Sequence, residues 1–164
     1  MNTIRFHFML LLSLAALALG GCNLFNRPPA LAGAGMDMFT PVKMRLHPLT
    51  RVTSADNAST VEARIELTDQ FDDICKGAGT VYFELFTYET LVPNHHGERV
   101  GFWNFDLSKP EANKEHWDGI TRTYLCKLPL PAAGLKKQSR LVLSATWALP
   151  NGARLTDEMP ISLK

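Results

Sequence analysis

The chain has 164 residues, of which 46% are hydrophobic and 20% are charged, with 17 Lys and Arg against 16 Asp and Glu. This composition is typical of one globular domain with a tail, and it excludes collagen-like and intrinsically disordered chains. A formal net charge of +1 provides no electrostatic basis for binding nucleic acid or an anionic surface. We therefore expect no nucleic-acid partner.

The first 22 residues have the three parts of a secretory signal. A short polar start carries Arg5, an apolar run extends from Phe8 to Leu19, and two glycines precede Cys22. The run is 12 residues long, whereas a helix that crosses a bilayer needs about 20. We expect residues 1–21 to be cleaved as a signal peptide.

The end of this segment, Leu19-Gly20-Gly21-Cys22, resembles the lipobox of bacterial lipoprotein precursors. The resemblance implies that Cys22 is acylated on sulfur, becomes the new N-terminus and anchors the protein in a membrane. Two or three acyl chains make a stable anchor, since each buried CH₂ contributes about 0.8 kcal/mol. In that family, a residue other than Asp after the cysteine favours the outer membrane, so Asn23 favours an outer-membrane location in the cell envelope. An ordinary export signal, with Cys22 incidental, is the alternative.

Residues 22–40 form the expected lipidated N-terminus and tether. They contain two prolines and two glycines without a sustained apolar period, which is typical of a flexible linker. The remaining residues, 41–164, form the expected folded domain.

From Pro41 onward the apolar residues follow a period of two, which indicates β-strands. Apolar side chains on both faces of one run predict a central strand there, and Asn151-Gly152 predicts a tight hairpin because it tolerates positive φ. A capping box at Ser108 with Pro110 in the first turn predicts one short helix that ends before Gly119. The expected strands are Val42–His47, Val61–Thr68, Thr80–Tyr88 (the central one), Val100–Leu107, Thr123–Leu128, Arg140–Trp147 and Arg154–Leu163.

Seven strands with one short helix predict an antiparallel β-sandwich, because two sheets with apolar inner faces can bury such strands. The stretch Leu67–Asp69, with Lys76–Leu85 after it, resembles the opening hairpin of bacterial immunoglobulin-like and transthyretin-like modules. The resemblance implies a mainly β sandwich of one of these types. It carries over no functional residue.

Cys75 and Cys126 remain as an even pair once Cys22 is lipidated, and disulfides persist in exported domains. A bridge would close a 52-residue loop and stabilise the fold by about 4 kcal/mol in the chain-entropy model. The alternative is two buried thiols that act as small apolar residues. Neither cysteine has the sequence pattern of a catalytic thiol.

The histidines have no spacing that requires a metal site, and His95-His96 are expected to be solvated in a hairpin loop. Three loop carboxylates, Asp69, Asp72 and Asp73, are candidate Ca²⁺ ligands, with turn formation as the alternative. We expect no metal and no cofactor.

Aromatic residues at alternating strand positions predict either a binding platform or core packing. They are Phe102, Trp103, Phe105, Trp117 and Trp147. Trp147 shares one face of its strand with Leu141, Leu143 and Ala145, and this apolar row predicts that Trp147 lies in the core.

The sequence contains no G-x-S-x-G, phosphate-binding glycine loop, H-E-x-x-H or C-x-x-C motif. We expect an envelope lipoprotein with a structural or binding module and no enzymatic activity. Its partners would be the membrane and a protein or glycan of the envelope. The alternatives are a Ca²⁺- or carbohydrate-binding protein and a hydrolase whose site is dispersed along the chain.

Overall fold

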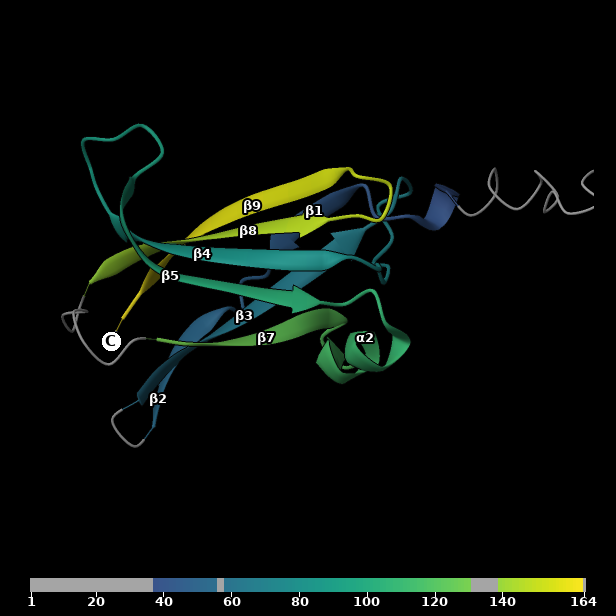
Figure 1. Ribbon diagram of the computed structural model, residues 1–164, viewed down its shortest axis with the longest axis horizontal. Coiled ribbons are helices and arrows are strands. Elements are labelled where there is room, and N and C mark those ends of the chain that lie inside the picture. Colours follow the sequence, from purple (N-terminus) through teal and green to yellow (C-terminus); the bar gives the residue numbers. More distant parts are fainter. Residues whose placement is uncertain (1–36, 56–57, 131–138, 164) are drawn as a thin grey trace, which may run out of the picture. The chain divides into compact units, whose positions relative to one another are not determined.

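The computed structural model describes residues 37–55, 58–130 and 139–163. The expected signal segment, Cys22 and most of the expected tether lie outside these residues. The chain divides into the units Met1–Asp37 and Met38–Lys164, and the second unit contains the folded domain. Its described residues form nine strands in two antiparallel sheets with one short α-helix, a mainly β, sandwich-like arrangement (Figure 1).

The first sheet is organised around the long strand β3 (Ala58–Thr68). One edge of β3 pairs with β1 and β2, its other edge pairs with β7, and β6 pairs with β7. The sequence did not predict β2, because Val52 is the only large apolar residue in it, nor β6, which was expected to be helical. The other bounds are β1 (Lys43–Leu46), β2 (Arg51–Ala55), β6 (Trp117–Asp118) and β7 (Thr123–Pro129).

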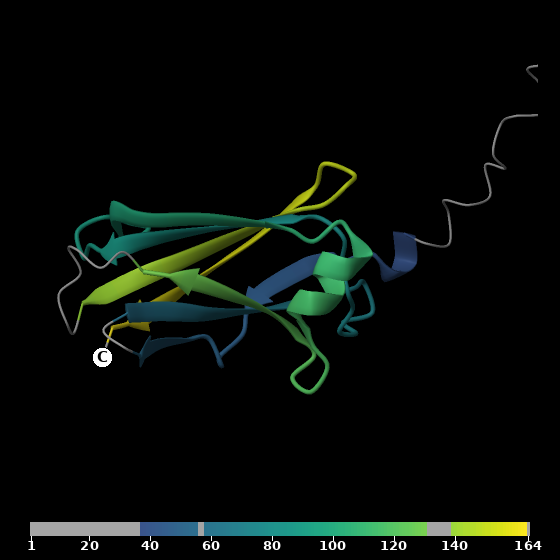
Figure 2. The same ribbon diagram turned by 60° about the horizontal axis from the view of Figure 1, so that its bottom comes forward.

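The second sheet has the order β5-β4-β8-β9, with every neighbouring pair antiparallel. The central position expected for Thr80–Tyr88 is confirmed, since β4 lies between β5 and β8. The two sheets lie face to face as separate layers (Figure 2). The bounds are β4 (Thr80–Tyr88), β5 (His96–Asp106), β8 (Arg140–Ala148) and β9 (Arg154–Ser162).

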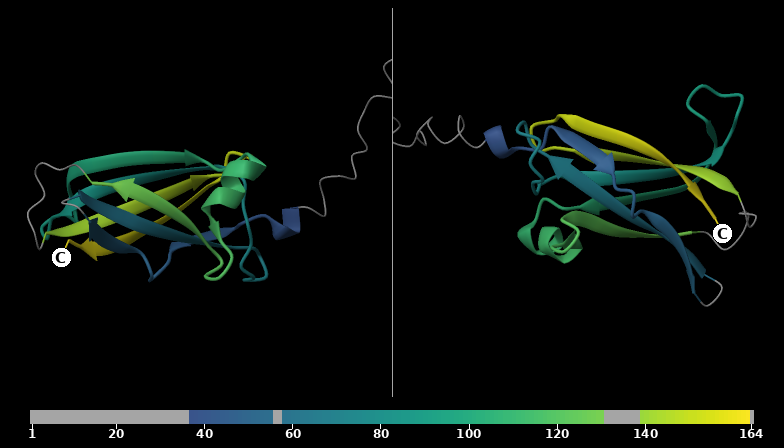
Figure 3. Two further views of the ribbon diagram at one scale, coloured as in Figure 1. Left: turned by 90° about the horizontal axis from the view of Figure 1, so that it is seen from below. Right: turned by 180° about the vertical axis from the view of Figure 1, so that it is seen from behind.

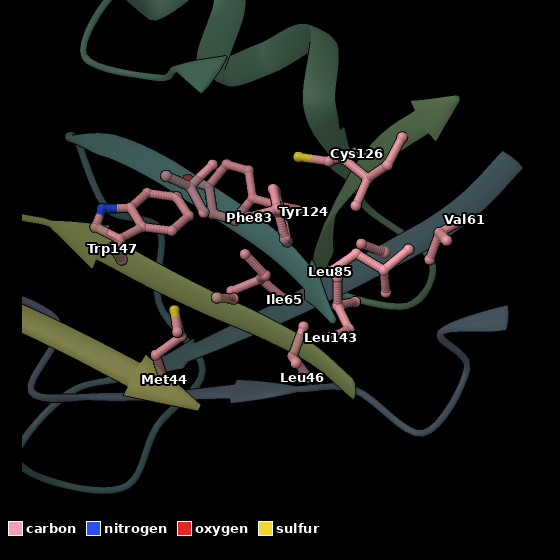
Figure 4. Close-up of a cluster of buried hydrophobic side chains, with 14 of the residues drawn as sticks. Met44, Leu46, Val61, Ile65, Phe83, Leu85, Tyr124, Cys126, Leu143 and Trp147 are labelled. Carbon is pink, nitrogen blue, oxygen red and sulfur yellow. The ribbon is translucent and has the colours of Figure 1, made fainter. Parts of the chain in front are cut away.

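The core lies between the sheets and consists of the inward rows of alternating strands (Figure 4). The predicted apolar faces of β3, β4 and β8 are confirmed, because every member is fully buried, Trp147 included. Val42 was expected inside but is exposed: it lies just before the first residue of β1, although its N–H still donates to Thr68 O at 2.9 Å. The buried rows are Val61, Ala63, Ile65 and Leu67; Val81, Phe83 and Leu85; and Leu141, Leu143, Ala145 and Trp147.

Strand β5 departs from simple alternation at Val100. Gly101 pairs with Leu85 and Arg99 pairs with Phe86, so Val100 is an extra residue in a β-bulge. A bulge reverses the phase of alternation, and Val100 therefore packs against the core although Phe102 points to solvent. The expectation that these two residues share a face was wrong.

The helix α2 (Pro110–His116) has Pro110 in its first turn, as expected. The capping box is not formed: Lys109 is the N-cap without a side-chain bond, and the Ser108 hydroxyl donates to Asp106 instead. The β8–β9 hairpin confirms the turn prediction, with Gly152 at φ 87° and its N–H donating to Leu149 O at 2.9 Å.

Candidate functional site

The outward surface of the β5-β4-β8-β9 sheet carries a concentration of aromatic side chains. Alternation in β4 buries Val81, Phe83 and Leu85, so the residues between them point outward. Phe102 of β5 joins them on that side. We call this surface the aromatic face; its aromatic residues are Tyr82, Phe86, Tyr88 and Phe102.

Tyr82 and Phe102 form an open pair on the aromatic face. Their ring centroids lie 6.2 Å apart with an interplanar angle of 26°. They are diagonal neighbours, since Tyr82 pairs with Asn104 while Phe102 pairs with Glu84. Half of the Phe102 side chain is exposed, at 51%. This pair therefore offers apolar ring surface to a ligand.

Polar groups surround the Tyr82–Phe102 pair in a grid that the strand register defines. Thr146 of β8 lies beside Tyr82, and Ser144 lies beside Glu84. Arg99 donates from Nη1 to Glu84 Oε1 at 2.7 Å and lies 5.9 Å from the Phe102 ring centroid. Hydroxyl, carboxylate and guanidinium groups thus stand at the rim of an apolar platform. Such an arrangement can bind the hydroxyl groups of a ligand whose body stacks on the rings.

The other two aromatic residues of the face already have stacking partners. The His96 ring stacks on Phe86 at 4.2 Å, and the His95 ring stacks on Tyr88 at 4.6 Å, while the Arg140 guanidinium lies 4.0 Å from the Tyr88 ring. These contacts hold the β4–β5 hairpin against the sheet. The expectation of solvated loop histidines was wrong, because both rings are partly buried by stacking.

His96 also approaches β9 across the sheet. Its Nε2 lies 3.1 Å from Glu158 Oε1, but the buried nitrogen has no hydrogen-bond partner of good geometry. The contact brings the β4–β5 hairpin close to β9 without a hydrogen bond. Phe102 of the open pair remains exposed.

The two cysteines of the domain are free thiols; Cys126 is buried, as the second alternative expected, whereas Cys75 is only half-buried. Cys126 lies opposite Ala63 of β3, whereas the Cys75 N–H donates to Leu67 O on the same strand. The two β3 residues that they contact, Ala63 and Leu67, are four positions apart, about 13 Å at about 3.3 Å per residue. The two cysteines are therefore too far apart along β3 for a bridge. Burial raises the pKa of the Cys126 thiol to about 12, and that of Cys75 is also raised, chiefly by burial.

The carboxylates at the end of β3 act as turn formers. Oδ1 of Asp69 accepts hydrogen bonds from the backbone N–H groups of Phe71 and Asp73, and Asp72 forms an ion pair with Lys43. In the part of the chain that the structure describes, no three His, Cys, Asp or Glu residues are grouped to hold a metal ion. Of the carboxylates proposed for Ca²⁺, Asp69 and Asp72 therefore each have one oxygen that already has a partner within the protein.

A polar cluster around Arg64 was not predicted from the sequence. Its Nη1 donates to Asp118 Oδ2 at 2.8 Å, to Thr121 Oγ1 at 2.8 Å and to Thr123 Oγ1 at 3.2 Å. The Arg64 guanidinium, aided by the Ile120 N–H, holds the pKa of the Asp118 carboxyl well below its usual range. The cluster fixes the turn before β7, and no local sequence signal joins residues this far apart.

The remaining aromatic candidates belong to the interior. Trp103, Phe105 and Trp117 pack against the core, and the fully buried Trp147 ring lies 5.0 Å from that of Tyr124. Hollows in the surface lie away from the aromatic face: one beside β1, one between β2 and β9, and one beside α2. Of the sequence candidates, Phe102 alone is therefore a platform residue.

Comparisons with known proteins find no matching family model, no matching curated protein and no matching solved structure. Within the described ranges, no helix has both the length and the apolar character needed to cross a bilayer. Function therefore has to be argued from the chemistry of this domain.

Proposed function

We propose that this chain is an exported lipoprotein, anchored in the outer membrane of the cell envelope through acyl chains on Cys22, whose sandwich domain binds an envelope glycan. The observation that carries the glycan proposal is the Tyr82–Phe102 pair, two stacked rings on the outward side of a sheet with polar groups at their rim. The anchor proposal depends on the lipobox-like end of the signal segment.

The strand order supports an immunoglobulin-like type over a transthyretin-like one. In chain order, β1, β3, β4, β5, β6, β7, β8 and β9 take the places of strands A, B, C, C′, D, E, F and G. The two sheets then read A-B-E-D and C′-C-F-G, which is the immunoglobulin arrangement with one added C′ strand. The aromatic face is the outer side of the C′-C-F-G sheet.

A glycan fits the aromatic face better than a small molecule. A pyranose ring presents apolar C–H groups on its faces and hydroxyl groups at its edge, which matches ring surface bordered by Thr146, Ser144 and Glu84. Small molecules need a concave site that buries most of their surface, whereas the face is the side of a sheet. A polymer gains affinity by extending over several side chains at once.

A sedimentation assay with purified peptidoglycan sacculi tests the binding proposal on the full mature protein. We expect the wild-type protein to pellet with the sacculi, and Tyr82→Ala and Phe102→Ala each to weaken binding about tenfold, the loss expected for an aromatic contact of about 1.4 kcal/mol. Leu49→Ala is the matched control, since Leu49 is an exposed apolar residue outside the face. Equal binding by all four proteins would contradict a role for the face, and capture of a protein through the two rings would identify a different partner class.

Incorporation of radiolabelled palmitate tests the anchor. Label should enter the wild-type chain and be absent from Cys22→Ser, because the sulfur of Cys22 is the proposed acylation site. Equal labelling of the two chains would refute the assignment.

A further inference from the structure

Exposed apolar side chains gather at the end of the sandwich where the chain enters the domain. We call this the entry end; it comprises residues 38–42, 69–76 and 119–122. Phe39 and Phe71 lie with ring centroids 6.2 Å apart. Arg122 Nη2 donates to Ile74 O at 3.0 Å, which joins the 119–122 turn to the 69–76 loop. Figure 3 shows these segments together at one end of the domain.

The apolar side chains of the entry end point into solvent. Ile120 is 95% exposed, Phe39 62% and Phe71 55%, so none of them contributes substantially to the core. Three large exposed apolar residues at one end of a domain, two of them with their rings in contact, are unusual for a surface that meets only water. They mark this end as an interaction surface.

The loops that carry Phe71 and Ile120 are held in fixed shapes. The Phe71 N–H donates to Asp69 Oδ1 at 2.9 Å, and the Ile120 N–H donates to Asp118 Oδ1 at 2.9 Å. Asp118 is in turn bound to Arg64. These hydrogen bonds fix the backbone of both loops, so the exposure of Phe71 and Ile120 is a defined feature of the fold.

We propose that the entry end rests on the lipid bilayer, with Phe39, Phe71 and Ile120 in the interfacial region. This inference rests on the proposed acylation of Cys22. Fifteen residues lie between Cys22 and Met38, so the distance between these two residues is at most about 55 Å when the chain is fully extended. The segment that begins at the proposed anchor continues directly into the entry end at Met38. The bilayer is therefore the surface that lies within reach of the entry end.

The charges of the entry end indicate an apolar contact. Asp72 is paired with Lys43, which follows the first segment of the entry end, and the Lys76 ammonium lies 4.8 Å from the Trp117 ring centroid. Asp73 is also exposed. Because acidic and basic groups are mixed there, attraction to anionic lipids contributes little to the free energy of membrane binding. Binding should therefore depend only weakly on salt concentration and on lipid charge.

Contact at the entry end would leave the aromatic face available to a glycan. The strands run between the entry end and the opposite end, where the β4–β5 hairpin lies (Figure 1). With the entry end on the bilayer, the strands point away from the membrane. The aromatic face, which is the side of a sheet, is then not covered by the bilayer. Leu91 of the hairpin, 91% exposed, would lie on the side far from the lipid.

Photo-crosslinking in membranes tests the inference on the full chain. We would place p-benzoylphenylalanine at Ile120 or Phe71, with Leu91 as the matched exposed control, in liposomes whose phospholipids carry ³²P-labelled headgroups. We expect several-fold more lipid adduct from positions 120 and 71 than from 91, in neutral and anionic liposomes alike. Equal adduct at all three positions, or crosslinks from 120 and 71 to a protein instead, would overturn the inference.

The parallel palmitate assay separates the two proposals. Acylated protein without preferential lipid adducts refutes membrane contact while the anchor stands. A chain that incorporates no palmitate at Cys22 refutes the proposed anchor and this inference with it.

Discussion

The phenol of Tyr124 donates a hydrogen bond to Oδ1 of Asn113 at 2.9 Å, which joins strand β7 to helix α2. The same hydroxyl accepts from the Gly77 N–H at 3.1 Å, and Asn113 Nδ2 donates to Gly77 O and to Leu107 O. One buried network therefore fixes the helix and the chain that enters β4. It satisfies backbone groups that have no ladder partner.

Removal of the Tyr124 hydroxyl should destabilise the domain. Tyr124→Phe leaves the Gly77 N–H and the Asn113 Oδ1 without their partner, which costs about 1–3 kcal/mol for a buried polar group. The measurement is the free energy of unfolding from urea titration, with Tyr82→Phe, at a half-buried position on the outward aromatic face, as the control. An unchanged midpoint for Tyr124→Phe would show that the network does not support the fold.

Trp147→Ala should cost about 3–5 kcal/mol, because it leaves a large cavity in a fully buried site. Trp147 contacts the Tyr124 ring and donates from Nε1 to Ala78 O at 3.3 Å. Thermal or denaturant unfolding measures the loss, and Phe102→Ala serves as the surface control. Loss of glycan binding with full stability would mean that Trp147, and not Phe102, is the platform residue.

Acid should weaken the Arg64–Asp118 contact. The pKa of Asp118 is lowered in the folded state, so its ionised form contributes stability above the ordinary carboxyl pKa of about 3.9, and this contribution falls away as the pH drops below that value. Asp118→Asn should therefore lower the denaturant midpoint at pH 7, and the difference from wild type should narrow toward pH 2. A difference that is constant with pH would refute the assignment; Asp72→Asn, in an exposed pair, is the control.

Both domain cysteines should be reduced. In the denatured mature protein without reductant, we expect a thiol reagent to modify Cys75 and Cys126. In the native protein Cys126 should react far more slowly, because it is fully buried and burial raises its pKa to about 12. Modification that requires prior reduction would show that the two residues are bridged and that the strand register at β3 is different.

Simple alternation was sufficient to predict β3, β4 and β8, since each has one continuous apolar row facing the core. It failed at β2, where Val52 has no apolar neighbours two residues away, and at Val100, where a bulge changes the phase. Bulges and edge strands depend on pairing partners that are distant in sequence. Local periodicity therefore carries too little information to place them.

The candidate site was predictable only in part. Alternation separates Tyr82 from Val81 and Phe83, but both sets contain aromatic residues, so the sequence does not say which set faces outward. The proximity of Tyr82 to Phe102 arises from the β4–β5 register, and that of Arg64 to Asp118 from the packing of the turn before β7. Both are consequences of tertiary structure.

Hydrogen exchange followed by mass spectrometry tests the central claim most directly. The intact protein would be compared with and without soluble glycan strands released from peptidoglycan. We predict slower exchange in β4 and β5, where Tyr82 and Phe102 lie, and no change in β3 and β7. Protection confined to β3 and β7, or no protection at saturating glycan, would contradict glycan binding by the aromatic face.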